Sequence, residues 1–186
     1  MDIFLDEDWL IFFYETLVNL YRGTEDPITF GYSKAMIHVC VERPQTDIYN
    51  KIPFPHLLHK AAVLMDTIIT FHPFADGNKR VALLATYYFL YWNGYDFNIP
   101  EDADEFTIEV ARSKFNVNKI LSWLTQNCKY TFISSLRNKV LFRICIFMSD
   151  ERHHLLQLLI VLTPLIVPFY PFAFIEHIRR RKKTKK

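Results

Sequence analysis

The sequence predicts an all-α helical bundle followed by a hydrophobic and basic C-terminal tail. In six stretches of the first 128 residues, apolar residues recur at the three- and four-residue spacing of an amphipathic helix. No stretch alternates apolar and polar residues with period two over a useful length. The chain has only 4 glycines, which disfavours a fold with many strands and tight turns.

The first three helices are predicted from their boundary residues. A helix over residues 6–21 begins with acidic residues, which favour a helix N-terminus. Ser33 can cap a second helix that runs to about Arg43, and Pro44 ends it because a residue before proline avoids the α conformation. A third helix is expected to start near Pro55, since proline is favoured at the first helical position.

The third helix is interrupted at residues 72–77, and a fourth is expected over residues 78–93. The fourth helix is apolar nearly all round, which predicts a place at the centre of the bundle. Gly94 just past its end supplies a residue that adopts the left-handed conformation. Two further amphipathic helices are expected near residues 102–114 and 116–127.

Charge divides the chain into two predicted regions, a domain over residues 1–128 and an extension over residues 129–186. The first holds 17 acidic and 10 basic residues, and the second holds 3 acidic and 12 basic residues. The extension contains 21 residues without formal charge, 155–175, which is long enough to span a bilayer. Three prolines there oppose a simple span.

For this tail we therefore keep three alternatives open: a re-entrant hairpin, a segment bound to an anionic membrane surface, and a segment that packs on a partner or is poorly ordered. We expect no nucleic-acid binding, because the acidic domain would oppose it. We expect a cytoplasmic protein, because the acidic N-terminus is the opposite of a signal peptide. The three well-separated cysteines, Cys40, Cys128 and Cys145, fit a reducing compartment.

The loop before the fourth helix combines residues suited to phosphate chemistry. Gly77 and Asn78 lead into a helix N-terminus, where free N–H groups and the helix dipole attract anions. Asp76 is a hard oxygen ligand suited to Mg²⁺, which takes one or two carboxylates together with substrate phosphates. Lys79 and Arg80 can neutralise phosphate charge. His72 is suited to accept a proton from an attacking hydroxyl near neutral pH.

His72-x-Phe74-x-Asp76-Gly77-Asn78-Lys79-Arg80 resembles the signature of the Fic/Doc family, and lysine in the eighth place resembles the Doc branch, the death-on-curing toxins. The resemblance covers roughly residues 1–125. Beyond the loop, it is carried by residues 42–45, 60–62 and 93–95. It implies a Fic/Doc-type bundle with a short flap. It also implies that His72 is the general base, that Asp76 binds Mg²⁺, and that Gly77, Asn78, Lys79 and Arg80 bind the phosphates of ATP.

The resemblance further implies a toxin of a toxin–antitoxin pair. Such a toxin phosphorylates a Thr or Ser hydroxyl of a target protein, with elongation factor Tu as the expected target, and an antitoxin restrains it. Family members that transfer AMP have glycine at position 79 and arginine at position 83, where this chain has Lys79 and Leu83. Phosphoryl transfer is therefore favoured over AMP transfer. A non-catalytic, membrane-tethered binding protein is the alternative from another class.

The segment from residue 45 to residue 54 lacks a helical period, and we expect a loop or short hairpin there. It lies where the family has a flap that aligns the target peptide by backbone hydrogen bonds. The resemblance thus assigns target docking to eight residues: Gln45, Thr46, Asp47, Ile48, Tyr49, Asn50, Lys51 and Ile52.

Overall fold

A computed structural model of the chain describes residues 2–24, 27–46, 56–113 and 117–132. The chain divides into two compact units, Met1–Asn138 and Lys139–Lys186, and all described residues belong to the first. The apolar stretch 155–175 and flap residues 47–52 lie outside the described residues, so the predictions made for them stay predictions.

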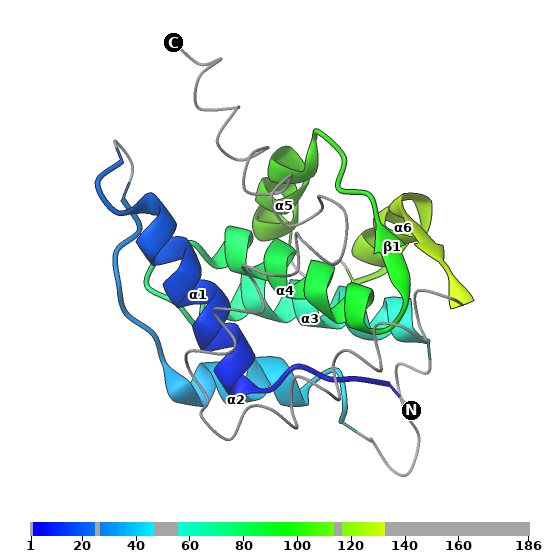
Figure 1. Ribbon diagram of the computed structural model, residues 1–186, viewed down its shortest axis with the longest axis horizontal. Coiled ribbons are helices and arrows are strands. Elements are labelled where there is room, and N and C mark those ends of the chain that lie inside the picture. The colour runs from blue at the N-terminus through cyan, green and yellow to red at the C-terminus, as the bar shows by residue number, and fades with distance from the viewer. Residues whose placement is uncertain (1, 25–26, 47–55, 114–116, 133–186) are drawn as a thin grey trace. The chain divides into compact units, whose positions relative to one another are not determined.

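Within the described ranges the fold is mainly helical, as predicted, and contains one small antiparallel sheet (Figure 1). In chain order the elements are α1 (Glu7–Tyr21), α2 (Lys34–Glu42), α3 (Leu57–Phe71), α4 (Asn78–Trp92), β1 (Tyr95–Phe97), α5 (Ala103–Arg112), α6 (Val117–Asn127) and β2 (Cys128–Tyr130). None of the helices in these ranges combines the length and the apolar character that a membrane span requires.

α3 and α4 form the centre of the bundle. They lie against each other, α1 and α5 also contact α4, and α2, α5 and α6 contact α3 (Figure 1). Most of α4 is buried, including polar residues such as Thr86, so the central position predicted from its all-round apolar character is confirmed. The loop between α3 and α4 is therefore attached at both ends to the buried central helices of the bundle.

Local sequence signals explain three of the helix ends. The Asp6 carboxylate accepts a hydrogen bond from the Trp9 N–H at 3.0 Å, and the Ser33 hydroxyl accepts one from the Met36 N–H at 3.5 Å. Gly94 follows α4 with φ of +86°, as predicted. α3 begins at Leu57 after His56, two residues later than the start expected near Pro55.

The two-stranded sheet was not predicted. β1 and β2 pair antiparallel in the register Tyr95↔Tyr130, Asp96↔Lys129 and Phe97↔Cys128. Strands of three residues are too short to display an alternating pattern. β2 continues to Tyr130, so the sheet includes two residues beyond the boundary that the charge distribution placed after residue 128.

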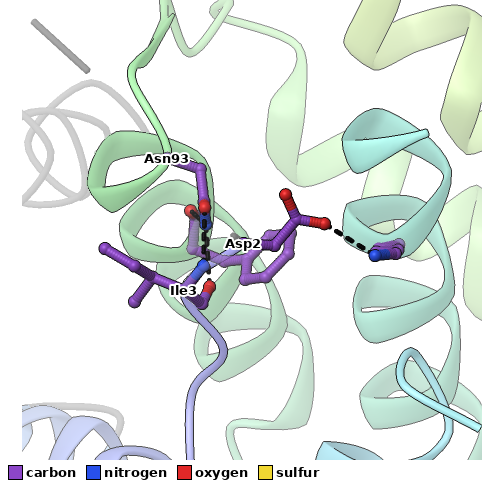
Figure 2. Close-up of polar contacts among 5 residues, drawn as sticks. Asp2, Ile3 and Asn93 are labelled. Atoms are coloured by element: carbon purple, nitrogen blue, oxygen red, sulfur yellow. Dashed lines mark hydrogen bonds and ion pairs between the residues drawn. The ribbon is translucent and has the colours of Figure 1, made fainter. Parts of the chain in front are cut away.

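Polar contacts join the first residues of the chain to both central helices, α3 and the end of α4 (Figure 2). The Asn93 side chain accepts a hydrogen bond from the Ile3 N–H and donates one to the Ile3 carbonyl, both at 2.8 Å. The Asp2 carboxylate pairs with the nearly buried ammonium of Lys60 on α3 at 2.6 Å. This segment therefore connects the end of α4 to α3.

Candidate functional site

The six residues 72–77 join α3 to α4 and contain three residues of the predicted site, His72, Asp76 and Gly77. His72 terminates α3 in the left-handed conformation, with φ of 48° and ψ of 59°. Among the described residues it is the one non-glycine residue with positive φ. Such a conformation costs about 1–2 kcal/mol for a residue with a Cβ, so the surrounding structure has to hold it. Its imidazole is exposed.

The segment Ile28–Ser33 supports the loop as a short antiparallel partner. The Ser33 N–H donates to the Pro73 carbonyl and the Ala75 N–H donates to the Gly31 carbonyl, both at 2.8 Å. A Cβ on residue 31 would lie 3.3 Å from the Ala75 Cβ, so glycine permits this close approach. The loop is thus held by backbone pairing as well as by its own ends.

Phe74 anchors the loop in the core. Its buried ring stacks on Tyr14 of α1, with 4.4 Å between ring centroids. The Tyr14 hydroxyl donates to the Thr29 carbonyl at 2.7 Å and accepts from the Gly31 N–H at 2.9 Å. Burial raises the pKa of Tyr14, and the negative charge of Asp76 adds to the increase. Tyr14 therefore ties α1 to both the loop and its partner segment.

Asn78 completes the anchoring of Phe74. Its side-chain oxygen accepts from the Phe74 N–H at 3.0 Å, and its side-chain nitrogen donates to the Phe74 carbonyl at 2.7 Å. Both polar groups of Phe74 point away from the Ile28–Ser33 segment, so they depend on Asn78. The buried side chain of Asn78 is committed to the loop, which leaves its backbone N–H as the group available to an anion.

The start of α4 supplies the predicted anion-binding groups. The first backbone bond of this helix runs from the Val81 N–H to the Gly77 carbonyl at 3.0 Å, so the N–H groups of residues 78–80 have no acceptor within the helix. Gly77 has φ of +78°, and a Cβ there would lie 3.4 Å from the Ile28 side chain. Glycine thus suits both the conformation and the close packing. The Asp76 carboxylate accepts from the Gly77 N–H at 2.5 Å.

The two cationic side chains at this helix end differ in environment. Lys79 is exposed, whereas Arg80 is half-buried with its guanidinium carbon 4.5 Å from the centroid of the Tyr21 ring. Leu83, where AMP-transferring relatives carry a second arginine, is an almost fully buried core residue. The exposed side of this helix start is therefore cationic through Lys79, with Arg80 held against α1.

Two of the eight predicted flap residues are described. The Gln45 side chain donates to the Val41 carbonyl at 2.8 Å, and the Thr46 hydroxyl donates to the Glu42 carbonyl at 3.0 Å. Both bonds fasten the turn after α2 onto the last turn of that helix. The remaining flap residues, 47–52, lie outside the described part of the chain.

The donor set fits Mg²⁺ together with the phosphates of ATP. Asp76 is exposed and directly precedes Gly77, where the N-terminus of α4 begins, and Lys79 is exposed in the first turn. In the described ranges no group of three or more His, Cys, Asp or Glu side chains could hold a metal by protein ligands alone. One carboxylate with phosphate oxygens is a usual Mg²⁺ environment, so Asp76 would hold the ion with the nucleotide.

The sequence predicted that Phe74 would anchor the loop by burying its ring, which the structure confirms, but three other residues that hold the site in place were not predicted. Tyr14, Tyr21 and Gly31 lie outside the loop, and their roles depend on contacts between segments distant in sequence. The one available signal for Gly31 was that the chain has only 4 glycines. A residue type used so rarely is expected at positions where the backbone requires it.

Comparison with known proteins identifies relatives of this chain. The Fic/DOC family model matches residues 4–90, a range that runs from the start of the bundle through most of α4. "Toxin Doc" of Mycolicibacterium smegmatis (strain ATCC 700084 / mc(2)155) is 33% identical over 118 residues, which cover 56% of this chain and 90% of that toxin. No solved structure matches the chain.

Proposed function

Because the chain belongs to the Fic/Doc family, whose members generally transfer nucleotide or phosphate groups to proteins, we propose that it is the toxin of a toxin–antitoxin pair. We propose further that it transfers the terminal phosphoryl group of ATP to a Thr or Ser hydroxyl of a target protein. The observation that carries this proposal is that His72 and Asp76 on the anchored loop and Lys79 in the first turn of α4 are all exposed.

The loop and the first turn of α4 supply the groups that take part in this reaction. The imidazole of His72 accepts the proton of the attacking hydroxyl as the new P–O bond forms, and the bond to the departing ADP breaks. Backbone N–H groups at residues 78–80 and the Lys79 ammonium neutralise the charge on the phosphates. Mg²⁺, when bound at Asp76, would supply further neutralisation of this charge.

Two residues favour phosphoryl transfer over AMP transfer. Lys79 places a side chain and a positive charge where AMP-transferring relatives have glycine. Leu83 is 3% exposed and packs in the core, so this position offers no cation for a second phosphate contact. The cationic groups available to a triphosphate are therefore Lys79 and Arg80, both in the first turn of α4.

The proposed target segment docks along residues 45–52, and elongation factor Tu is the proposed target. Support for docking along this segment comes from the turn at Gln45 and Thr46. Hydrogen bonds hold this turn on α2, so the position where the docking segment begins is fixed. An extended peptide paired to this segment by backbone hydrogen bonds would bring its hydroxyl to His72.

An antitoxin is the second proposed partner. The sequence lacks the Ser/Thr-x-x-x-Glu-Gly/Asn motif by which many family members restrain themselves. A toxin of this kind then requires a separate chain to restrain it. The relative named "Toxin Doc" supports this assignment.

Transfer of radioactive label from ATP tests the proposal. The full-length chain is incubated with Mg²⁺, elongation factor Tu and ATP labelled at either the γ or the α phosphate. Label from the γ position on the factor is expected, and label from the α position would instead identify AMP transfer. His72→Ala should abolish transfer, and His56→Ala is the matched control because His56 is an exposed histidine at the opposite end of α3.

Membrane association of the tail is tested separately. We propose that residues 155–175 bring the chain to an anionic membrane surface, since they are uncharged and are followed by a basic end. Cell fractionation of the chain with and without residues 150–186 distinguishes the possibilities. Equal recovery of both forms in the soluble fraction would eliminate the membrane proposal and favour a tail that packs on a partner.

A further inference from the structure

Arg43 connects the end of α2 to the part of α3 that leads to His72. It is the residue directly after α2, and its guanidinium reaches across to α3. Nη1 donates to the Thr67 hydroxyl at 3.1 Å and lies 3.5 Å from Oδ2 of Asp66. The guanidinium carbon also lies 5.6 Å from the centroid of the Phe71 ring.

The burial of these partners makes the connection specific. Asp66 is 1% exposed and Thr67 is fully buried, and a carboxylate in that position requires charged or polar partners to remain ionised. Arg43 is itself partly exposed, with 29% of its side chain open to solvent. A planar guanidinium can contact Asp66, Thr67 and the Phe71 ring together, which the compact ammonium of lysine does not do equally well.

The location of Arg43 links it to the proposed reaction. Phe71 directly precedes His72 in sequence. On the other side, Arg43 is followed by Pro44 and by Gln45 and Thr46, whose side chains bond back to α2. The chain continues from this turn into the segment assigned to target docking. Arg43 therefore lies between the start of the docking segment and the helix end that carries the proposed base.

We propose that Arg43 is a positioning residue: through Asp66, Thr67 and Phe71 it fixes where the docked target hydroxyl lies relative to His72. The inference rests on the proposed function. In the described part of the chain the Arg43 guanidinium contacts Asp66, Thr67 and Phe71 on α3, and not residues 76–80, so its loss should affect the target protein and spare ATP.

A double variant, Arg43→Met with Asp66→Asn, separates positioning from simple stabilisation. Arg43→Met alone leaves a buried carboxylate without its arginine and should destabilise the fold, whereas the added Asp66→Asn removes that charge and should recover much of the loss. In the double variant, the KM for elongation factor Tu should rise about 10-fold or more, because a docking segment that starts from a displaced turn binds the target less tightly, and each ~1.4 kcal/mol of lost binding is tenfold. The KM for ATP should stay within about 2-fold.

Arg112→Met is the matched control, since Arg112 is an exposed arginine on α5 with no ion pair to any residue in the described ranges. If Arg43 only stabilises the fold, a smaller fraction of the variant molecules is folded and active. The kcat should then fall, and the KM for the target should stay unchanged. That result in the double variant would overturn the proposal. If the double variant does not fold, Arg43→Lys, which keeps the charge, should raise the same KM by a smaller factor, and a wild-type KM would overturn it.

Amide hydrogen exchange provides a readout independent of activity. In the double variant, exchange in peptides covering residues 43–46 and 70–73 should accelerate at least several-fold, while α5 and α6 keep their wild-type rates. Unchanged exchange in both peptides would overturn the proposal. Should the wild-type chain transfer no label to elongation factor Tu, the proposed function fails by itself, and the exchange measurement still decides whether Arg43 holds the turn after α2 and the end of α3 in place.

Discussion

Replacing Asn78 by alanine tests the anchoring of the active loop. The change removes the two hydrogen bonds, at 3.0 and 2.7 Å, that satisfy the buried N–H and carbonyl of Phe74. A buried polar group left without a partner costs about 1–3 kcal/mol, so two of them cost about 2–6 kcal/mol. Alanine returns roughly 0.5 kcal/mol through its higher helix propensity. The expected loss of unfolding free energy is therefore about 2–5 kcal/mol.

Urea denaturation followed by circular dichroism measures this loss, and the slope should remain that of the wild type. Asn118→Ala is the matched control, because Asn118 is an exposed asparagine in the first turn of α6. It should change the free energy by less than about 0.5 kcal/mol. A similarly small effect of Asn78→Ala would refute the conclusion that this side chain holds the loop.

Three further predictions follow from the contacts around the loop and from the buried thiols. Tyr14→Phe removes the hydroxyl bonded to Thr29 and Gly31, and should lower the unfolding free energy by about 1–2 kcal/mol in urea denaturation; an unchanged midpoint would contradict the bracing role of Tyr14. Gly77→Ala should cost about 1–2 kcal/mol because φ is +78°, and should slow label transfer; wild-type stability would show that the backbone relaxes freely. Burial raises the pKa of the Cys40 and Cys128 thiols to about 12. Unfolded thiols ionise near pH 9 while the folded ones stay protonated, so the urea midpoint should fall as pH rises from 9 towards 12, and a Cys40→Ala variant should show a smaller fall.

The helices could be predicted because their signals are local. The Asp6 and Ser33 caps, the acidic first turn of α1 and the glycine after α4 each act within a few residues of the chain. The central place of α4 followed from its all-round apolar composition. The sheet between residues 95–97 and 128–130 joins segments about 30 residues apart, and three-residue strands leave no periodic pattern to find.

The site was predictable as a list of chemical groups and less so as an arrangement. The sequence indicates the loop because His72, Asp76 and Lys79 each have a chemical use near a phosphate. It does not indicate that the side chain of Asn78 serves the loop, since an asparagine at a helix start can equally face a ligand. Nor does it indicate the contacts of Arg43, whose partners on α3 are known only once the helices are packed.

A crystal structure of the full-length chain with Mg²⁺ and a non-hydrolysable ATP analogue tests the central claim most directly. The account predicts phosphate oxygens within hydrogen-bonding distance of the N–H groups at the start of α4, the metal ion on Asp76, and the His72 imidazole facing the terminal phosphate. A nucleotide bound elsewhere, or phosphates that leave those N–H groups without contact, would contradict it.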